Sequence, residues 1–239
     1  MAGAAFPRSA GGDLVMPAEV LVFDMDGVLV DVTGSYRETI RRTVKHFTGQ
    51  EISNERIQQL KNAGGWSNDW DVTCRLIEEL GVKPDYGAVV AQFQKYFLGE
   101  GDNGLILEER WVAAPGLLER LSLNYRLAVF TGRPRLEAEL TLARFARRIR
   151  FDPVIGAEDV ELGKPAPDGL QLIVALTGAR RMWYVGDTVD DARSARAAGV
   201  PFIGIAAETS PRRDELVELF RRENAIAVLP DINHLETVL

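Results

Sequence analysis

The chain is poor in cysteine and in basic charge, and it has no long apolar run. Cys74 is the only cysteine among 239 residues, which excludes a disulfide framework within the chain and favours a reducing, cytoplasmic compartment. Lys and Arg number 28 against 35 Asp and Glu, for a formal net charge of −7. This balance argues against a nucleic-acid or anionic-membrane partner. No apolar run approaches the length of a membrane span.

The N-terminal residues 1–17 are rich in Ala and Gly. They lack the basic start and apolar centre of a secretory signal, so we expect a flexible tail there. The chain as a whole is 46% apolar and 26% charged, which is ordinary for a globular protein. The sequence does not distinguish a monomer from a homodimer.

Short apolar runs alternate with amphipathic stretches over most of the chain. This pattern is typical of an α/β fold, a Rossmann-like doubly wound parallel sheet with helices on both faces. The predicted strands cover residues 19–23, 125–130, 151–155, 182–185, 201–205 and 225–229. The helices predicted between them cover residues 115–123, 135–148, 167–176, 189–198 and 211–222.

About a hundred residues between the first two strands carry helical patterns instead. Ser35 and Glu38 have the spacing of a capping box, which predicts the start of the first helix. Asn68 is a predicted N-cap of another helix, and further helical patterns cover 51–62 and 86–98. We therefore predict an inserted helical domain over residues 33–112. The α/β core would consist of residues 18–32 and 113–239.

Polar residues follow the predicted strands at their carboxyl ends, where open parallel sheets bind ligands. Asp24 and Asp26 follow the first strand, and Thr131 follows the second. Lys164 lies in a Gly-Lys-Pro loop. The fourth strand is followed by three carboxylates, at Asp187, Asp190 and Asp191. The predicted fold would bring these distant groups to one edge of the sheet.

This ordered set resembles the four signature motifs of the haloacid dehalogenase superfamily. The first is Asp24-Met25-Asp26-Gly27-Val28-Leu29, the second is Thr131, the third is Lys164, and the fourth is Gly186-Asp187-Thr188-Val189-Asp190-Asp191. The helical insertion lies between the first and second motifs. That position is similar to subfamily IA, whose members carry a helical C1 cap and are mostly phosphatases. The resemblance implies that residues 33–112 form such a cap domain.

The resemblance also implies a role for each motif residue. Asp24 would be the nucleophile that forms an aspartyl-phosphate, and Asp26 the general acid–base. Thr131 and the Gly132 amide would bind a phosphate oxygen. Lys164 would offset charge on the phosphoryl group and keep Asp24 ionised.

A divalent cation would relieve the repulsion among the clustered carboxylates. Mg²⁺ prefers oxygen ligands and keeps several of its waters while it binds substrate phosphate. The resemblance implies Asp24 and Asp187 as direct carboxylate ligands and the Asp26 backbone carbonyl as a third. Asp191 would act directly or through water, and Asp190 ranks lower.

Substrate contacts are predicted from two further places. Arg133 follows the phosphate-binding pair and is predicted to reach the substrate, with a solvated or salt-bridged role as the alternative. Trp66, Asn68 and Asp69 belong to a glycine-containing loop that we expect to reach over the active site and select the substrate. The alternative for the loop is that its tryptophans only pack the cap.

The sequence thus predicts a Mg²⁺-dependent phosphatase acting on a small phosphorylated metabolite. A phosphomutase of the same superfamily and a non-catalytic phosphate-ligand-binding protein remain as alternatives. Phosphonate cleavage would need a cap lysine that forms a Schiff base, for which Lys45 or Lys61 could be proposed. Residues 31–36 also resemble a small group of relatives with histidine-pathway names, although no residue there identifies an imidazole substrate.

Overall fold

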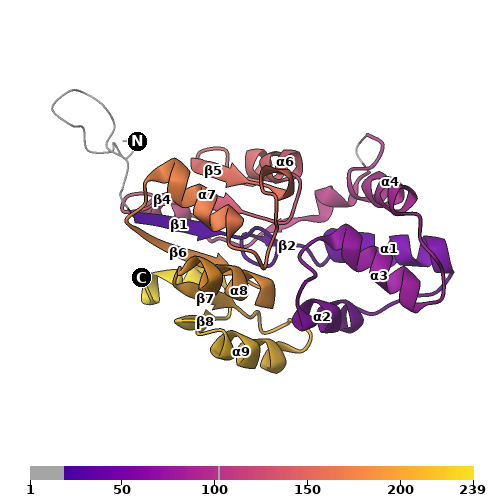
Figure 1. The fold of residues 1–239 in the computed structure, drawn as a ribbon. Helices are drawn as coiled ribbons and strands as arrows, with labels where there is room; N and C mark the ends of the chain where they lie inside the picture. The colour runs from indigo at the N-terminus through magenta and orange to yellow at the C-terminus, as the bar shows by residue number, and fades with distance from the viewer. Residues whose placement is uncertain (1–18, 102) are drawn as a thin grey trace.

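The computed structural model describes residues 19–101 and 103–239, so the predicted tail at 1–17 lies outside the described residues. Figure 1 shows an α/β core beside a smaller group of helices, which we call the cap. The core contains a six-stranded sheet, and the cap is inserted after its first strand. No helix in these two ranges is long and apolar enough to cross a bilayer.

The sheet is parallel throughout, in the order β5-β4-β1-β6-β7-β8. Its strands are β1 Glu19–Phe23, β4 Arg126–Phe130, β5 Phe151–Ile155, β6 Arg181–Gly186, β7 Phe202–Ile205 and β8 Ala227–Leu229. In β1, Val20 and Val22 pack into one apolar cluster, and Leu21 and Phe23 into another. Burial on both faces explains why strands such as β1, β4 and β7 are nearly continuous apolar runs. The predicted α/β fold is confirmed.

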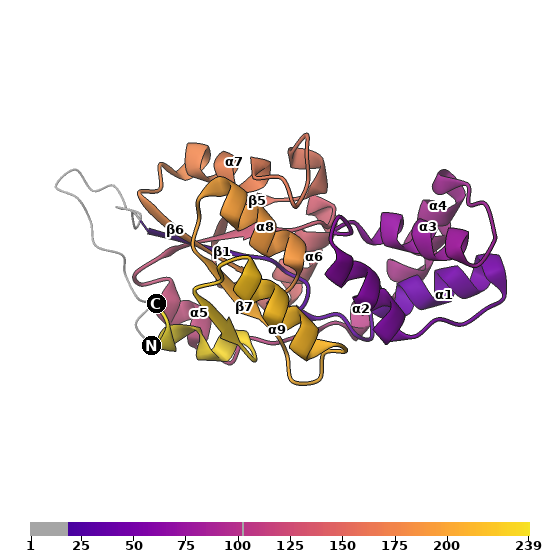
Figure 2. The same ribbon diagram turned by 60° about the horizontal axis from the view of Figure 1, so that its bottom comes forward.

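Helices cover both faces of this sheet. The Leu21 side carries α5 Leu117–Leu121, α6 Arg135–Phe145 and the 3₁₀ helix η3 Ile232–Thr237. The Val20 side carries α7 Asp168–Thr177, α8 Val189–Ala198 and α9 Arg213–Arg222. Figure 2 shows α8 and α9 across this second face, with the cap helix α2 beside them. A short 3₁₀ turn, η2 Ala157–Asp159, follows β5.

The cap joins the core through a two-stranded antiparallel ribbon. Its strands are β2 Val30–Asp31 and β3 Arg110–Trp111. Between them lie α1 Tyr36–Thr48, α2 Asn54–Ala63, α3 Asp69–Glu79, α4 Tyr86–Phe97 and the 3₁₀ helix η1 Leu105–Glu108. The apolar cluster of Leu21 and Phe23 continues into these helices, so cap and core share one contiguous apolar interior.

Two of the predicted helix starts have different outcomes. Asn68 caps α3 as expected, because its side-chain oxygen accepts from the Trp70 and Asp71 amides. The capping box predicted at Ser35 is wrong, because the Ser35 side chain makes no hydrogen bond to α1. Its partner in that box, Glu38, instead forms ion pairs with arginines three and four residues later, the neighbouring positions on the helix surface.

Candidate active site

The ends of β1, β4 and β6 meet at one edge of the sheet. Both β4 and β6 pair with β1, and the chain reverses its direction of travel across the sheet there. Asp24, Thr131 and Asp187 each stand directly after one of these strands. The Asp24 amide donates to the Val185 carbonyl at 2.8 Å and so continues the β1 ladder. Parallel pairing therefore brings Asp24 to the same edge as two residues that lie more than a hundred positions later in the sequence.

Lys164 lies between two carboxylates at this edge. Its Nζ is 2.9 Å from Asp24 Oδ1 and 2.6 Å from Asp191 Oδ1. All three side chains are buried. Burial opposes charge on Lys164, but the two carboxylates outweigh it and raise its pKa. Burial raises the pKa of Asp24 to about 7, against the lowering effect of Lys164. Lys164 lies beside Asp24 as predicted, but it does not by itself keep Asp24 ionised, because burial outweighs its effect and the net pKa of Asp24 is raised.

Three carboxylates form a cluster that could hold a metal ion. One oxygen each from Asp24, Asp187 and Asp191 lies within 4.8 Å of the others. Burial, followed by the charges of Asp24 and Asp191, raises the pKa of Asp187 well above its usual range. Gly27 permits this approach, since a Cβ there would lie 1.9 Å from Asp187 Oδ2. The cluster's charge repulsion is the condition that a cation would relieve.

Asp191 is the most firmly held member of the cluster. Its Oδ2 accepts from the Thr188 amide at 2.9 Å and hydroxyl at 2.6 Å, and its Oδ1 accepts from the Tyr184 hydroxyl at 2.6 Å. Burial opposes its ionisation, but Lys164 and these hydrogen bonds outweigh burial and lower its pKa. The same Thr188–Asp191 pair forms the capping box of α8. Capping and a place in the acidic cluster are thus compatible.

The Asp26 carboxylate is engaged elsewhere. Arg133 donates to Asp26 Oδ1 through Nε at 2.8 Å and also through Nη2. The Arg133 Nη1 atom lies 2.7 Å from Glu109 Oε1 and donates to Thr141 Oγ1 at 3.1 Å. Arg133 is only 2% exposed, which favours the salt-bridged alternative over the predicted substrate contact. Use of the Asp26 carbonyl as a metal ligand stays a prediction.

This buried network extends into the cap. The Arg133 guanidinium stacks 4.5 Å from the ring centroid of Tyr36, in the first turn of α1. The Tyr36 hydroxyl donates to Glu137 on α6, which also accepts from Gln94 Nε2 on α4 at 2.7 Å. Cap and core are therefore linked by polar contacts that lead to Asp26.

The loop before α3 rests on the core at the edge of the site. The amides of Gly65 and Trp66 donate to the Asp190 carboxylate at 2.8 and 2.9 Å. Ser67 Oγ donates to the Lys164 carbonyl at 2.9 Å, and its own carbonyl would lie 2.6 Å from a Cβ on Gly132. Gly132 is thus needed for loop contact as well as for any phosphate contact.

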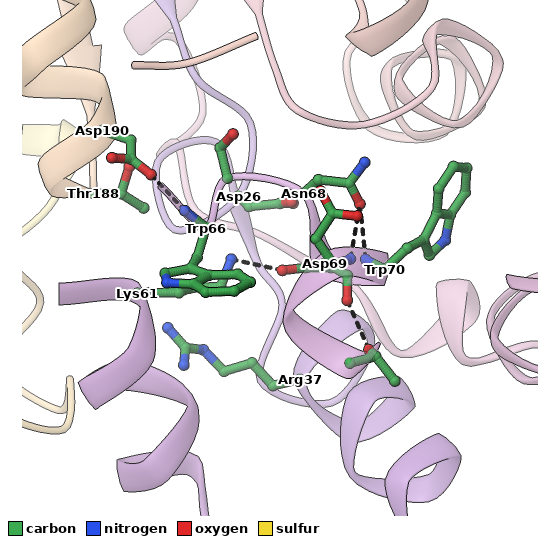
Figure 3. Close-up of polar contacts among 12 residues, drawn as sticks. Asp26, Arg37, Lys61, Trp66, Asn68, Asp69, Trp70, Thr188 and Asp190 are labelled. Atoms are coloured by element: carbon green, nitrogen blue, oxygen red, sulfur yellow. Dashed lines mark hydrogen bonds and ion pairs between the residues drawn. The ribbon is translucent and has the colours of Figure 1, made fainter. Parts of the chain in front are cut away.

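The cap and the core enclose a cavity between them. Its core wall includes Asp24, Asp26, Gly132, Lys164, Asp187 and Thr188. Its cap wall consists of Val32, Arg37, Lys61, Ser67 and Asp69. Thr131 and Asn68 line an adjoining cavity beside Gly132 and Lys164. Trp66 meets the core through its amide, which donates to Asp190 (Figure 3). The substrate roles of these loop residues stay predictions.

Sequence reasoning missed three residues of this region. Asp190 ranked low because its partners are backbone amides about 125 positions away in the sequence. In the structure it nevertheless anchors the cap loop. Arg37 has no predicted role and Lys61 is offered only for Schiff-base chemistry, because a cation on an amphipathic helix has the pattern of a solvated face. Only the folded cap shows that both line the cavity.

Comparison with known proteins decides the family. Residues 18–199 match the haloacid dehalogenase-like hydrolases. The chain belongs to this family. A haloacid dehalogenase-like hydrolase from Bacteroides fragilis has a similar structure, with a TM-score of 0.73 at 23% identity over 90% of this chain and 98% of that one. The predicted family membership is confirmed.

Two curated relatives add information on activity. The chain is 27% identical to a phosphoglycolate phosphatase from Shigella boydii, over 77% of this chain and 80% of that protein. It is 35% identical over 201 residues to an imidazoleglycerol-phosphate dehydratase from Phytophthora nicotianae. That second match covers 80% of this chain but only 44% of the longer relative. Family and phosphatase relatives together support a phosphatase enzyme, as the motifs predicted.

Proposed function

We propose that this protein is a Mg²⁺-dependent phosphatase that hydrolyses a small phosphorylated metabolite through an aspartyl-phosphate on Asp24. The observation that carries this proposal is the buried group of Asp24, Lys164 and Asp191, of which Asp24 and Lys164 line the cavity beneath the cap. A carboxylate held by a cation at the end of a strand is suited to attack phosphorus. The family and its phosphatase members support this chemistry.

The reaction would proceed in two displacements. An Asp24 oxygen forms a bond to phosphorus while the bond from phosphorus to the leaving oxygen breaks, and Asp26 gives its proton to that oxygen. Asp26 then takes a proton from a water that attacks the same phosphorus. The acyl phosphate breaks, inorganic phosphate leaves and the Asp24 carboxylate is restored. Lys164 offsets negative charge during both displacements.

The acidic cluster fits a hard divalent cation. Asp24, Asp187 and Asp191 offer three oxygens within 4.8 Å of one another, and oxygen is the ligand that Mg²⁺ prefers. Asp24 and Asp187 would hold the ion, with the Asp26 carbonyl, and Asp191 would act directly or through water. When bound, Mg²⁺ would neutralise charge on the phosphoryl group and help to orient it.

Lys61 is poorly suited to the Schiff-base chemistry that phosphonate cleavage needs. Its Nζ lies 2.6 Å from Asp69 Oδ1, in a pair of largely buried side chains. Burial lowers the pKa of Lys61, but Asp69 outweighs burial and the net pKa is raised. A Schiff base requires the neutral amine, so the observed pairing disfavours that reaction.

Phosphate release from p-nitrophenyl phosphate and from a panel of phosphorylated metabolites tests the proposal. The protein should be assayed with Mg²⁺, with a chelator and as Asp24→Asn. We expect turnover that requires Mg²⁺ and that falls at least about ten-thousandfold in Asp24→Asn. Asp214→Asn is the matched control, because this carboxylate is fully exposed on α9.

Each contrary outcome points to a different alternative. Transfer of the phosphoryl group to a second hydroxyl of a sugar phosphate, without release of phosphate, would indicate a phosphomutase. Binding of Mg²⁺ and phosphate by a folded protein that turns over no ester would indicate a non-catalytic binding protein. Undiminished turnover in Asp24→Asn would remove the aspartyl-phosphate from the mechanism. A cytoplasmic location stays a prediction that cell fractionation can test.

A further inference from the structure

The cap wall of the cavity carries two cations that the proposed chemistry does not use. Arg37 extends from the first turn of α1, and Lys61 from the last turn of α2. Both line the cavity whose core wall includes Asp24 and Asp187. In Figure 3 the two cations and Asp69 extend from three cap segments into the space in which Asp26 also lies. Two cations that line the same cavity as the nucleophile are expected to have a role in binding the substrate.

Arg37 is the less well satisfied of the two. Its Nη2 donates to Gln58 Oε1 at 2.6 Å, and that acceptor carries no charge. Its Nη1 is buried without a hydrogen-bond partner among residues 19–101 and 103–239. A buried donor without an acceptor is costly, and such groups in native proteins call for an explanation. An oxygen of a bound ligand would supply the missing acceptor.

Lys61 adds a second positive charge on the same wall. Its side chain is 13% exposed and forms its ion pair with Asp69, which also lines the cavity. Asp69 keeps Lys61 protonated, as its raised pKa indicates. The pair of cap cations therefore outnumbers the single cap carboxylate, and the cap wall is net positive.

The cations of the core wall are already committed. Lys164 is shared between Asp24 and Asp191, and Asp26 is bound by Arg133. These groups, with a metal ion, would account for the reacting phosphate. Arg37 and Lys61 on the cap wall therefore remain to face the part of the substrate beyond its reacting phosphate.

We propose that Arg37 and Lys61 bind a second anionic group of the substrate, a carboxylate or a second phosphate close to the reacting ester. This inference rests on the proposed phosphatase function and names its substrate class. A guanidinium can donate two parallel hydrogen bonds to either anion, and an ammonium adds a point charge. An ester without the second anion would leave the Arg37 Nη1 atom unsatisfied, and so would be selected against.

Matched esters test the inference through kcat/KM. The first pair is 2-phosphoglycolate and ethyl phosphate, which differ in a carboxylate. The second pair is ethane-1,2-diol bisphosphate and 2-hydroxyethyl phosphate, which differ in a phosphate. We expect the wild type to prefer one doubly anionic ester, and the preferred pair identifies the second anion. Arg37→Gln should reduce that preference about ten- to a hundredfold, as expected for charge-assisted hydrogen bonds.

Controls separate recognition from damage to the fold. Turnover of p-nitrophenyl phosphate should fall less in Arg37→Gln than turnover of the preferred doubly anionic ester, because p-nitrophenyl phosphate lacks a second anion. Arg42→Gln removes a half-exposed cation from the same helix and should leave the preference intact. Arg37→Lys keeps the positive charge and should retain part of the preference for the doubly anionic ester. Equal loss on all esters in Arg37→Gln, or no preference in the wild type, would overturn the inference.

A binding measurement separates this inference from the proposed function. Titration calorimetry on the wild-type protein with Mg²⁺ would compare 3-phosphonopropionate with propylphosphonate, because a phosphatase does not hydrolyse the C–P bond of either ligand. Tighter binding of the carboxylate-bearing phosphonate, lost on adding Arg37→Gln, would support the cap cations even if no ester is hydrolysed. Propane-1,3-bisphosphonate provides the corresponding phosphate comparison. Equal affinities for the singly and doubly anionic ligands in both comparisons would sink the inference while leaving the phosphatase proposal untouched.

Discussion

Two buried cations of the core each bridge a pair of carboxylates, but the surroundings of the two pairs differ. Lys164 joins Asp24 to Asp191 at the wall of the cavity. Arg133 joins Asp26 to Glu109 and stacks on Tyr36 of the cap. The first cluster consists of motif residues around the nucleophile. The second ties the proposed general acid to the ribbon that connects cap and core, because Glu109 immediately precedes β3.

This difference suggests that the Lys164 cluster and the Arg133 cluster have separate roles. The Lys164 cluster concerns the phosphoryl group, and the side chains that hold Lys164 and Asp191 in place, those of Asp24, Tyr184 and Thr188, all belong to the core. The Arg133 cluster includes Tyr36 of the cap, so the orientation of Asp26 depends on where the cap lies. Removing each cation should therefore cause losses of different kinds.

The largest effect is expected from Lys164→Met. Without the Lys164 ammonium, no side-chain cation beside Asp24 would offset the negative charge of the phosphoryl group. We expect kcat/KM for p-nitrophenyl phosphate to fall about a thousandfold, and to fall similarly for every other ester. Lys83→Met, in the exposed turn before α4, serves as the control. A loss below about tenfold would mean that Lys164 only balances charge in the resting site.

Arg133→Met should act on stability before it acts on chemistry. It strands Glu109, whose side chain is fully buried, and breaking such a pair costs about 3 kcal/mol or more of unfolding free energy. Urea denaturation measures this loss. Arg181→Met is the control, since its ion pair with Glu19 is exposed and should cost at most about 1 kcal/mol.

A double variant shows whether the Arg133 loss comes from the stranded charge. Glu109→Gln removes that charge, so adding it to Arg133→Met should restore part of the stability, and the two losses should not add. Strict additivity would show that the two side chains are not coupled.

Arg133→Lys should reduce turnover of alkyl phosphates more than that of p-nitrophenyl phosphate, because only the poorer leaving groups depend strongly on an acid.

The two clusters also differ in how well the sequence predicts them. Asp24, Lys164 and Asp191 each lie in a short motif, and parallel strand order alone brings such motifs to one edge. Arg133 carries no such signal. Its partner Asp26 lies 107 positions earlier in the sequence, and its partner Glu109 lies before β3, α5 and β4. A guanidinium after a strand therefore has the same local pattern whether it meets substrate or a buried carboxylate.

The sequence predicts that the cap is helical, but it does not predict all the contacts that the cap side chains make. Helical periodicity predicts its four helices, and Asn68 caps α3 as expected. The Ser35 prediction failed because the local spacing says nothing about competing partners: Glu38 pairs with neighbouring arginines instead. Which cations of α1 and α2 face the cavity depends on how the helices rotate against the core, and periodicity does not fix that rotation.

A third expectation concerns pH and the cap end of the Arg133 network. Burial raises the pKa of Glu137, against hydrogen bonds from Tyr36 and Gln94 that lower it. The folded state therefore holds this proton more tightly than the unfolded state, whose glutamate pKa is about 4.3. Unfolding free energy should then fall as pH rises from that value through the raised folded pKa, and remain lower above it.

Glu137→Gln removes this penalty. Relative to the wild type, the variant should become more stable as pH rises through the same window, and urea unfolding at several pH values measures the difference. Glu139→Gln, an exposed position on the same helix, supplies the baseline. An opposite trend, with Glu137→Gln losing stability as pH rises, would mean that the ionised Glu137 is favoured by its partners despite burial.

The smallest expected effect concerns the loop that joins the two halves of the site. Asn68→Ala removes the cap of α3 and should lower the unfolding free energy by about 1 kcal/mol. Asn68→Asp keeps an acceptor oxygen and should retain most of that stability. If Asn68 only caps the helix, Asn68→Ala should leave the ratio of kcat/KM values across the metabolite panel unchanged. A changed ratio at unchanged p-nitrophenyl phosphate turnover would instead support the predicted role of this loop in substrate selection, and would extend the cap's contribution beyond the Arg37 and Lys61 charges.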